Sequence, residues 1–191
     1  MAEPESKIQQ PEVNIIYKCK RGDTNAFKII VELYQKYLYN LAFKILLDEE
    51  NTKDIVQDSF LKIWRNIKTY NEKYLFTTWI YRIVINNCYD FLKSQKVRLA
   101  YANEIDRKDT GSITEDTYSN RELIKQIRLF SRELSNKQRM VFILKDLQDL
   151  SLSEVSQILN MPKEVVKSNL YYARKNIKVK ILMMEKQEET K

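Results

Sequence analysis

Residues 151–180 read SLSEVSQILNMPKEVVKSNLYYARKNIKVK, and this stretch predicts two helices joined by a tight turn. Ser151 and Glu154 have the spacing of a capping box, in which the hydroxyl accepts from the amide three residues on and the carboxylate reaches back. Asn160 stands where the first helix should end, and asparagine tolerates the left-handed conformation of a C-cap. Pro162 suits the start of the second helix, where its missing N–H costs nothing.

The second helix of this stretch has an apolar face and a polar face. Its apolar residues recur at helical spacing, which predicts one buried side: Val166, Leu170, Ala173 and Ile177. The outer face and its flanks combine cations, a hydroxyl and aromatic rings: Lys167, Ser168, Tyr171, Tyr172, Arg174 and Lys175. Such a face suits a DNA major groove, where cations meet phosphates and short polar side chains reach base edges. The plainer interpretation is an ordinary helical hairpin with a solvated basic face.

The composition predicts an all-α protein. The chain has 191 residues, of which 43% are hydrophobic, enough for one domain or two small ones with a real core. It contains two glycines and three prolines, and its long periodic stretches have the helical period rather than strand alternation. The formal net charge of +7 favours anionic partners.

Several residue types that enzymes and metal sites need are missing. The chain has no histidine, and Cys19 and Cys88 are isolated, so neither a zinc site nor a histidine-dependent catalytic group can be built. With glycine only at positions 22 and 111, there is no glycine-rich phosphate loop. We therefore expect no enzyme activity, metal, cofactor or small-molecule substrate. Residues 1–11 lack a signal-peptide pattern and no stretch is apolar enough to span a bilayer, which favours the cytoplasm.

Two small helical domains joined by a flexible acidic linker are the predicted architecture, with the helix–turn–helix in the C-terminal domain. The expected boundaries are a disordered N-terminus at 1–12, a first domain at 13–98, a linker at 99–120, a second domain at 121–182 and a tail at 183–191. The linker holds five acidic residues and has no apolar period, so it should not be forced into regular structure.

The first domain should contain four helices, over about 13–20, 26–47, 54–67 and 77–95. Gly22 breaks the first helix and Asp23 caps the second, while Asn51 or Thr52 caps the third. The third helix turns Ile63 inward and Asp54, Gln57 and Asp58 outward, with Trp64 near the boundary. From spacing alone, its outer face is simply solvated.

An aromatic loop precedes the fourth helix. Residues 69–77 lack a helical period and carry Tyr70, Tyr74 and Phe76, which could stack on nucleic-acid bases or tuck the loop onto the core. The helix then places Trp79, Arg82, Asn86 and Lys93 on one side. An asparagine and a tryptophan on a basic face can pair with and stack on an extruded base. Alternatively, the asparagine caps a loop and the tryptophan covers the edge of the core.

Five motifs, in this order, resemble bacterial RNA polymerase sigma factors of the extracytoplasmic-function (ECF) subfamily. They are GDTNAF (22–27), DIVQDSFLKIW (54–64), FTTWIYRIVINNCYDFL (76–92), LSNKQRMVFIL (134–144) and SLSEVSQIL with VKSNLYYARKNI (151–177). The resemblance covers about residues 15–181. It implies a non-enzymatic subunit that binds core RNA polymerase, directs it to promoters and helps to melt the minus-ten element.

The resemblance also implies roles for single residues. Docking on the largest polymerase subunit is implied for Asp54, Gln57, Asp58, Ile63 and Trp64. Opening of the minus-ten element and capture of a flipped base of the single-stranded non-template strand are implied for Asn71, Tyr74, Phe76, Trp79, Arg82, Asn86 and Lys93. Reading of the minus-thirty-five duplex is implied for Lys167, Ser168, Tyr171, Tyr172, Arg174 and Lys175. The acidic linker is implied to thread toward the RNA exit path, and an anti-sigma factor, often part of a membrane protein, is an expected partner.

Two alternatives compete with this interpretation. The chain could be a stand-alone helix–turn–helix regulator whose N-terminal domain senses a ligand or dimerises, or a helical adaptor that binds only protein. A sensor would need an apolar pocket in place of a basic aromatic loop beside the DIVQDSF helix. Val166 and Asn169 stand where the family often has threonine and a basic residue, so the recognised promoter is expected to differ.

Overall fold

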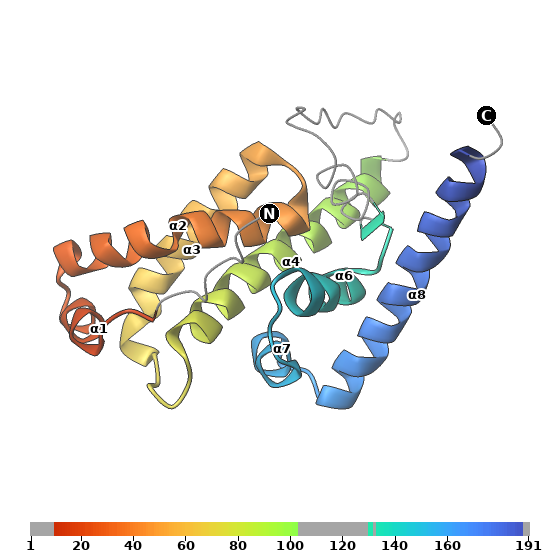
Figure 1. Ribbon diagram of the computed structural model, residues 1–191. Helices are drawn as coiled ribbons and strands as arrows, with labels where there is room; N and C mark the ends of the chain where they lie inside the picture. The colour runs from red at the N-terminus through yellow and green to blue at the C-terminus, as the bar shows by residue number, and fades with distance from the viewer. Residues whose placement is uncertain (1–9, 103–129, 132, 189–191) are drawn as a thin grey trace. The chain divides into compact units, whose positions relative to one another are not determined.

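The computed structural model describes residues 10–102, 130–131 and 133–188, and these residues form helices and no strand (Figure 1). The all-α prediction is therefore confirmed. The described residues pack as two compact units that divide inside one helix, after Asp90. The predicted linker lies outside the described residues except for 99–102, which are helical.

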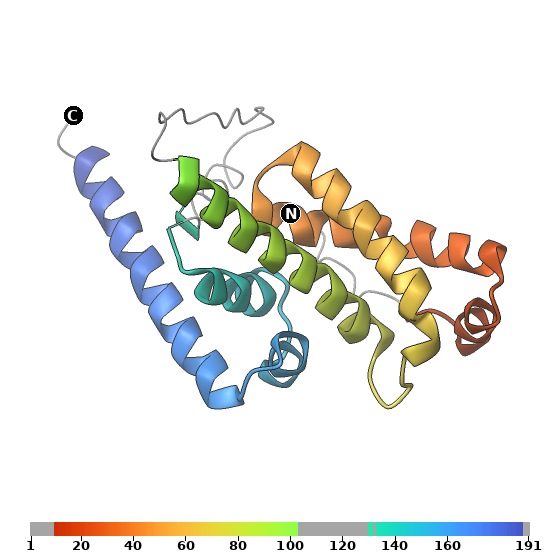
Figure 2. The same cartoon turned by 180° about the vertical axis from the view of Figure 1, so that it is seen from behind.

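The N-terminal unit contains three long helices and shorter elements. In chain order these are α1 (Val13–Lys20), α2 (Thr24–Leu46), α3 (Glu49–Asn66), the 3-10 turn η1 (Ile67–Thr69) and α4 (Phe76–Ala102), of which α4 continues past the unit boundary. A loop after η1 connects α3 to α4 (Figure 2). α1 has the predicted bounds, whereas α4 is longer than predicted at its C-terminal end.

The start of α2 follows the sequence prediction. Gly22 has φ +90°, a backbone conformation that strains any residue with a side chain, so it turns the chain out of α1. The Asp23 carboxylate accepts hydrogen bonds from the backbone N–H groups of Asn25 and Ala26 at 2.9 and 3.0 Å. The predicted cap is confirmed, because two N–H groups of the first turn find a partner there.

The start of α3 differs from the prediction. Asp48, not Asn51 or Thr52, is the N-cap residue, and its Oδ1 accepts from the Asn51 N–H at 2.9 Å. Glu49 and Glu50 therefore belong to the first helical turn, where negative charge interacts favourably with the helix dipole. The helix thus begins before the predicted start at residue 54, and the Thr52 hydroxyl donates back to the Asp48 carbonyl.

The core of the N-terminal unit lies among α2, α3 and α4. Buried side chains repeat along each helix at the spacing of one apolar stripe: Ile30, Tyr34, Leu38, Leu41 and Ile45 on α2, Val56 and Ile63 on α3, and Ile80, Val84 and Cys88 on α4. Cys19 and Cys88 are 1% and 0% exposed, as small apolar residues would be.

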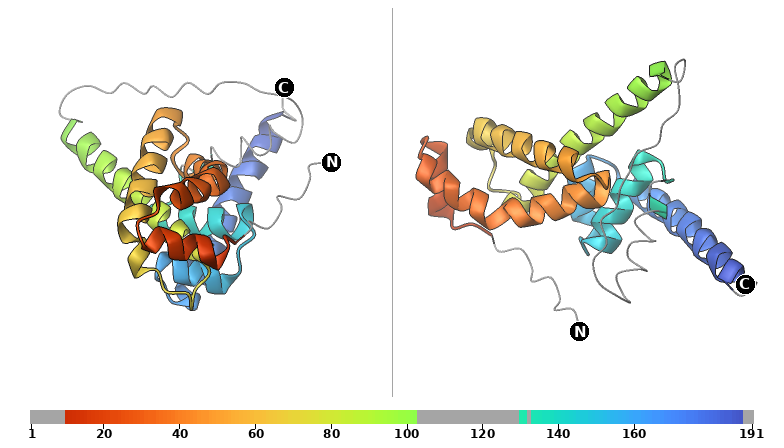
Figure 3. Two further views of the ribbon diagram at one scale, coloured as in Figure 1. Left: turned by 90° about the vertical axis from the view of Figure 1, so that its left-hand side faces the viewer. Right: turned by 90° about the horizontal axis from the view of Figure 1, so that it is seen from above.

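The C-terminal unit is built around the predicted helix–turn–helix. It contains α6 (Asn136–Phe142), the π-helical turn η2 (Ile143–Leu147), α7 (Leu152–Leu159) and α8 (Lys163–Glu188). Its core is a set of apolar side chains from all four elements: Val141, Leu144, Val155, Ile158, Val166 and Leu170. α8 is one long rod that continues into the predicted tail at 183–188 (Figure 3). Of the helices in the described ranges, none is long and apolar enough to cross a membrane.

Candidate nucleic-acid interface and docking faces

The turn between α7 and α8 is fixed by local hydrogen bonds. Ser151 Oγ accepts from the Glu154 N–H at 3.2 Å, and the Glu154 carboxylate accepts from the Ser151 N–H at 2.8 Å, so the predicted capping box is confirmed. Asn160 adopts the predicted left-handed conformation, with φ 50°. The Ser156 hydroxyl donates to the Met161 carbonyl at 2.6 Å across the turn. These bonds set the direction in which α8 leaves α7.

Most of the outer face of α8 is exposed among the described residues of the C-terminal unit. The four predicted inward residues, Val166, Leu170, Ala173 and Ile177, are all buried. Lys167, Ser168 and Lys175 are exposed, and Tyr171 and Tyr172 are 62% and 51% exposed. The two tyrosine rings pack edge to face with centroids 5.4 Å apart, so they form one aromatic surface beside the cations.

A basic groove of about 680 Å³ runs beside the exposed face of α8. It is lined by Lys145, Leu152, Lys167, Leu170, Tyr171, Arg174, Lys175 and Lys178. The predicted residues Ser168 and Tyr172 lie outside its lining. Lys145 was missed by the sequence reasoning, because it belongs to η2 and only the packing of η2 against α7 and α8 brings it here. The concentration of five cations makes this groove suited to a polyanion.

Arg174 already has a partner in the protein. Its Nε and Nη2 donate to the two carboxylate oxygens of Asp146 on η2, at 2.8 and 2.6 Å. The hydrogen bond to Asp146 raises the pKa of the Arg174 guanidinium. Because the side chain is still 57% exposed, Arg174 connects η2 to α8 and keeps part of its surface toward the groove.

The outer face of α3 carries three of the five predicted docking residues. Asp54, Gln57 and Asp58 are exposed. Trp64 is half-buried, and its ring lies 4.9 Å from that of Phe27 on α2. Ile63 is 0% exposed, so its prediction as a docking residue is wrong: its side chain fills the core, which is where its own helical spacing had placed it.

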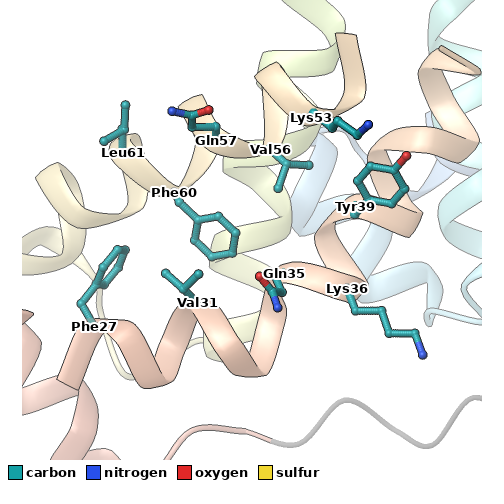
Figure 4. A pocket seen from close by; sticks show the side chains of 10 residues that line it. All are labelled: Phe27, Val31, Gln35, Lys36, Tyr39, Lys53, Val56, Gln57, Phe60 and Leu61. Atoms are coloured by element: carbon teal, nitrogen blue, oxygen red, sulfur yellow. The ribbon is translucent and has the colours of Figure 1, made fainter. Parts of the chain in front are cut away.

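An apolar groove of about 580 Å³ lies between α2 and α3. The side chains that line it come from both helices (Figure 4): Phe27, Val31, Gln35, Lys36, Tyr39, Lys53, Val56, Gln57, Phe60 and Leu61. Gln57 is the predicted docking residue that reaches this groove. Leu61, 47% exposed, also lines the groove, and it was missed because an apolar residue inside a helix gives no sign of exposure in the sequence.

Some aromatic residues of the loop pack onto the core and others are exposed, so each of the two alternatives left open by the sequence applies to part of the loop. Tyr70 and Phe76 are 7% and 1% exposed and pack together with ring centroids 5.1 Å apart, so they tuck the loop onto the core. The prediction that Phe76 contacts DNA is therefore wrong in this conformation. Tyr74 and Leu75 are 53% and 50% exposed just before α4, and Asn71 is also exposed.

The predicted DNA-facing side of α4 has one covered and three open residues. Trp79 is half-buried, with its ring 5.4 Å from that of Tyr70 and 5.5 Å from that of Phe76. It therefore covers the edge of the core while part of the side chain stays accessible. Arg82, Asn86 and Lys93 are exposed. Among the residues with described positions, no cluster of three histidine, cysteine or acidic side chains could hold a metal ion.

Comparison with known proteins gives consistent results. Two family models match, Sigma-70 region 2 at residues 30–98 and Sigma-70 region 4 at residues 124–177. The chain is 30% identical over 173 residues to the ECF RNA polymerase sigma factor SigW of Bacillus subtilis, covering 85% of this chain and 92% of the relative. It is 26% identical to the ECF RNA polymerase sigma-E factor of Escherichia coli, over 87% of this chain and 92% of that protein.

A solved structure has a similar fold. The sigma factor RpoE of Bartonella quintana, crystallised with the anti-sigma factor NepR, superposes with a TM-score of 0.67 and 20% sequence identity. The match covers 79% of this chain and 93% of that chain.

Proposed function

Because the chain belongs to the family of ECF RNA polymerase sigma factors, we propose that its N-terminal unit docks on the polymerase and opens the minus-ten element while its C-terminal unit reads the minus-thirty-five element. The protein is a non-enzymatic subunit that directs RNA polymerase to promoters. The observation that supports these separate roles for the two units is the basic, aromatic outer face of α8. This face is exposed beside a groove lined by five cations.

Recognition of the minus-thirty-five duplex is assigned to α8. Ser168 and Tyr171 are exposed near the N-terminal end of the helix, the part that enters the major groove in helix–turn–helix proteins. Lys167 and Lys175 contact phosphates, and Lys145 and Lys178 extend this contact along the groove. Tyr172 adds aromatic surface at the edge. The Asn169 amide donates to the Val165 carbonyl at 2.8 Å, so it is turned back onto its own helix.

Docking on core RNA polymerase is assigned to the outer face of α3. Asp54 and Asp58 provide negative charge, Gln57 provides an amide at the mouth of the apolar groove, and Leu61 provides an exposed apolar side chain. Trp64 supports this face from behind through its contact with Phe27. An apolar centre surrounded by charged residues is typical of a specific protein–protein interface.

Opening of the minus-ten element is assigned to exposed residues of the 71–76 loop and to α4. Tyr74 is exposed for stacking on an unpaired base, Asn71 lies beside it in the loop, and Asn86 offers an amide with both a donor and an acceptor. Arg82 and Lys93 supply positive charge for the strand backbone. A base that leaves the stack costs a few kcal/mol, which these contacts must offset.

The proposal also includes a protein partner and a cellular location. An anti-sigma factor that covers the polymerase-binding faces is expected, since the similar Bartonella protein was crystallised with one. A membrane-anchored form of such a partner and a cytoplasmic location belong to the same proposal. We also propose that the first domain ends at residue 98, that the second domain spans residues 121–182, and that the acidic linker tethers the two domains.

Binding to core polymerase and promoter selection test the proposal together. The full chain is mixed with core RNA polymerase, and the holoenzyme selects fragments from a randomised DNA pool. We expect a stable complex and a selected motif with two elements. Asp58→Lys should weaken core binding roughly tenfold or more, whereas the matched reversal Glu32→Lys on the exposed face of α2 should not. A chain that binds DNA tightly but never core polymerase would overturn the assignment in favour of a stand-alone regulator.

A further inference from the structure

The segment before α2 holds the loop that we assign to promoter opening. Gln10 and Lys20 both contact the region 70–77, although they lie outside the residues matched by the region 2 family model. The contacts span more than fifty positions in the chain, so local sequence patterns do not explain them.

Gln10 caps the first turn of α4 from outside. Its Oε1 accepts from the Phe76 N–H at 3.1 Å, and its Nε2 donates to the Thr77 hydroxyl at 2.9 Å. The first N–H groups of a helix have no partner within the helix, so this side chain does what an N-cap residue normally does. Pro11, the next residue, is buried and anchors the segment on the unit. The C-terminal end of the loop is thereby tied down.

Lys20 holds the other end of the loop. Its Nζ lies 3.2 Å from Glu72 Oε1 and 5.4 Å from the centre of the Tyr70 ring, which is within cation–π range. Tyr70 in turn donates its hydroxyl to the Tyr74 carbonyl at 2.6 Å. The Lys20 side chain is 24% exposed, so the ion pair is partly shielded from solvent. One lysine thus connects α1 to the loop directly and through Tyr70.

We propose that Gln10 and Lys20 are positioning residues that pre-form the 71–76 loop for capture of an unpaired promoter base. The inference rests on the proposed function, because it assumes that this loop receives the base. Its physical basis is conformational entropy: fixing a free residue costs about 1–2 kcal/mol, so a loop ordered in advance binds with a smaller loss. Tyr74 and Leu75 remain exposed while both ends of the loop are held.

The test compares Lys20→Met and Gln10→Ala with the control Lys18→Met, which removes the same charge from an exposed position of α1. Amide hydrogen exchange of residues 71–76 is measured in the full chain. Permanganate reactivity of unpaired thymines is measured with the holoenzyme on a fragment that the wild type selects from a random pool. We expect faster exchange and about fivefold less opening for Lys20→Met and for Gln10→Ala, with unchanged binding to core polymerase and duplex.

A charge swap separates positioning from general damage. Glu72→Lys alone should reduce opening at least as much as Lys20→Met, because it places like charges together. Lys20→Glu combined with Glu72→Lys should recover part of the loss, since the ion pair returns without the cation over Tyr70. Unchanged loop exchange in Lys20→Met and Gln10→Ala would overturn the inference whatever the DNA results, and faster exchange with wild-type opening would overturn it too. Failure of the wild type to open any selected fragment would instead overturn the proposed function.

Discussion

Replacing Asp146 by asparagine should tighten binding of the C-terminal unit to duplex DNA while it destabilises the fold. The carboxylate holds Arg174 by two hydrogen bonds at 2.8 and 2.6 Å, and Arg174 lines the basic groove. Exposed ion pairs contribute about 0.2–1 kcal/mol to folding, and the 57% exposure of the Arg174 side chain places this pair near that range. The variant should therefore lose about 1 kcal/mol of stability at most.

The gain in DNA binding follows from the released guanidinium. Each phosphate neutralised by a cation adds about 0.9 to the slope of log affinity against log salt, so the Asp146→Asn slope should steepen by up to that amount. Arg174→Ala should flatten the slope by less than Lys167→Ala, because Asp146 already neutralises part of its charge. Fluorescence anisotropy with a wild-type-selected duplex, between about 50 and 200 mM salt, measures both slopes.

Glu133→Gln is the matched control, because Glu133 pairs at 2.7 Å with Lys180, which does not line the groove. Its salt slope should equal that of the wild type. If Asp146→Asn weakened duplex binding as much as Arg174→Ala does, the ion pair would be aligning α8 for DNA. The reasoning that Asp146 and phosphate compete for Arg174 would then be wrong.

Three further predictions concern single residues. Lys167→Ala should reduce the salt slope of duplex binding by roughly 0.9, and an unchanged slope would remove Lys167 from the phosphate contacts. Asn87→Ala should cost about 1–3 kcal/mol in urea unfolding, because it leaves the buried Ser59 hydroxyl without its donor; a neutral effect would contradict this. Burial raises the pKa of the Cys19 and Cys88 thiols to about 11 and about 12, so both stay protonated at about pH 8 and should react with a thiol reagent only after unfolding; rapid reaction of the native protein would refute it.

The features that could be predicted from the sequence are those set by neighbouring residues. The capping box of Ser151 and Glu154, the left-handed Asn160 and the cap at Asp23 each depend on residues at most three positions apart. The buried stripe of α8 follows from helical spacing alone. The predicted N-cap of α3 was wrong because three residues that can cap a helix, Asp48, Asn51 and Thr52, lie close together in the sequence. The sequence does not say which of them starts the helix.

The features that could not be predicted depend on contacts between distant residues. Arg174 and Asp146 are 28 positions apart, and only folding turns a DNA-contact candidate into an internal ion pair. In the aromatic loop, Tyr70 and Phe76 are buried and Tyr74 is exposed, although all three are aromatic and two are the same residue type. The path of the loop between η1 and α4 determines which ring is buried, and the sequence of this loop has no periodic pattern that would predict its path.

A buried polar contact connects the helix assigned to polymerase docking with the helix assigned to DNA. The Asn87 amide on α4 donates to Ser59 Oγ on α3 at 2.8 Å, and Lys62 on α3 donates to the Asn87 carbonyl oxygen. Ser59 itself donates to the Ile55 carbonyl at 2.6 Å. An apolar contact between two helices tolerates sliding, whereas these directional bonds are satisfied in one register only. These bonds therefore keep a fixed spacing between the outer faces of α3 and α4. Under the proposed assignment, the way the polymerase binds α3 also determines where α4 meets the promoter.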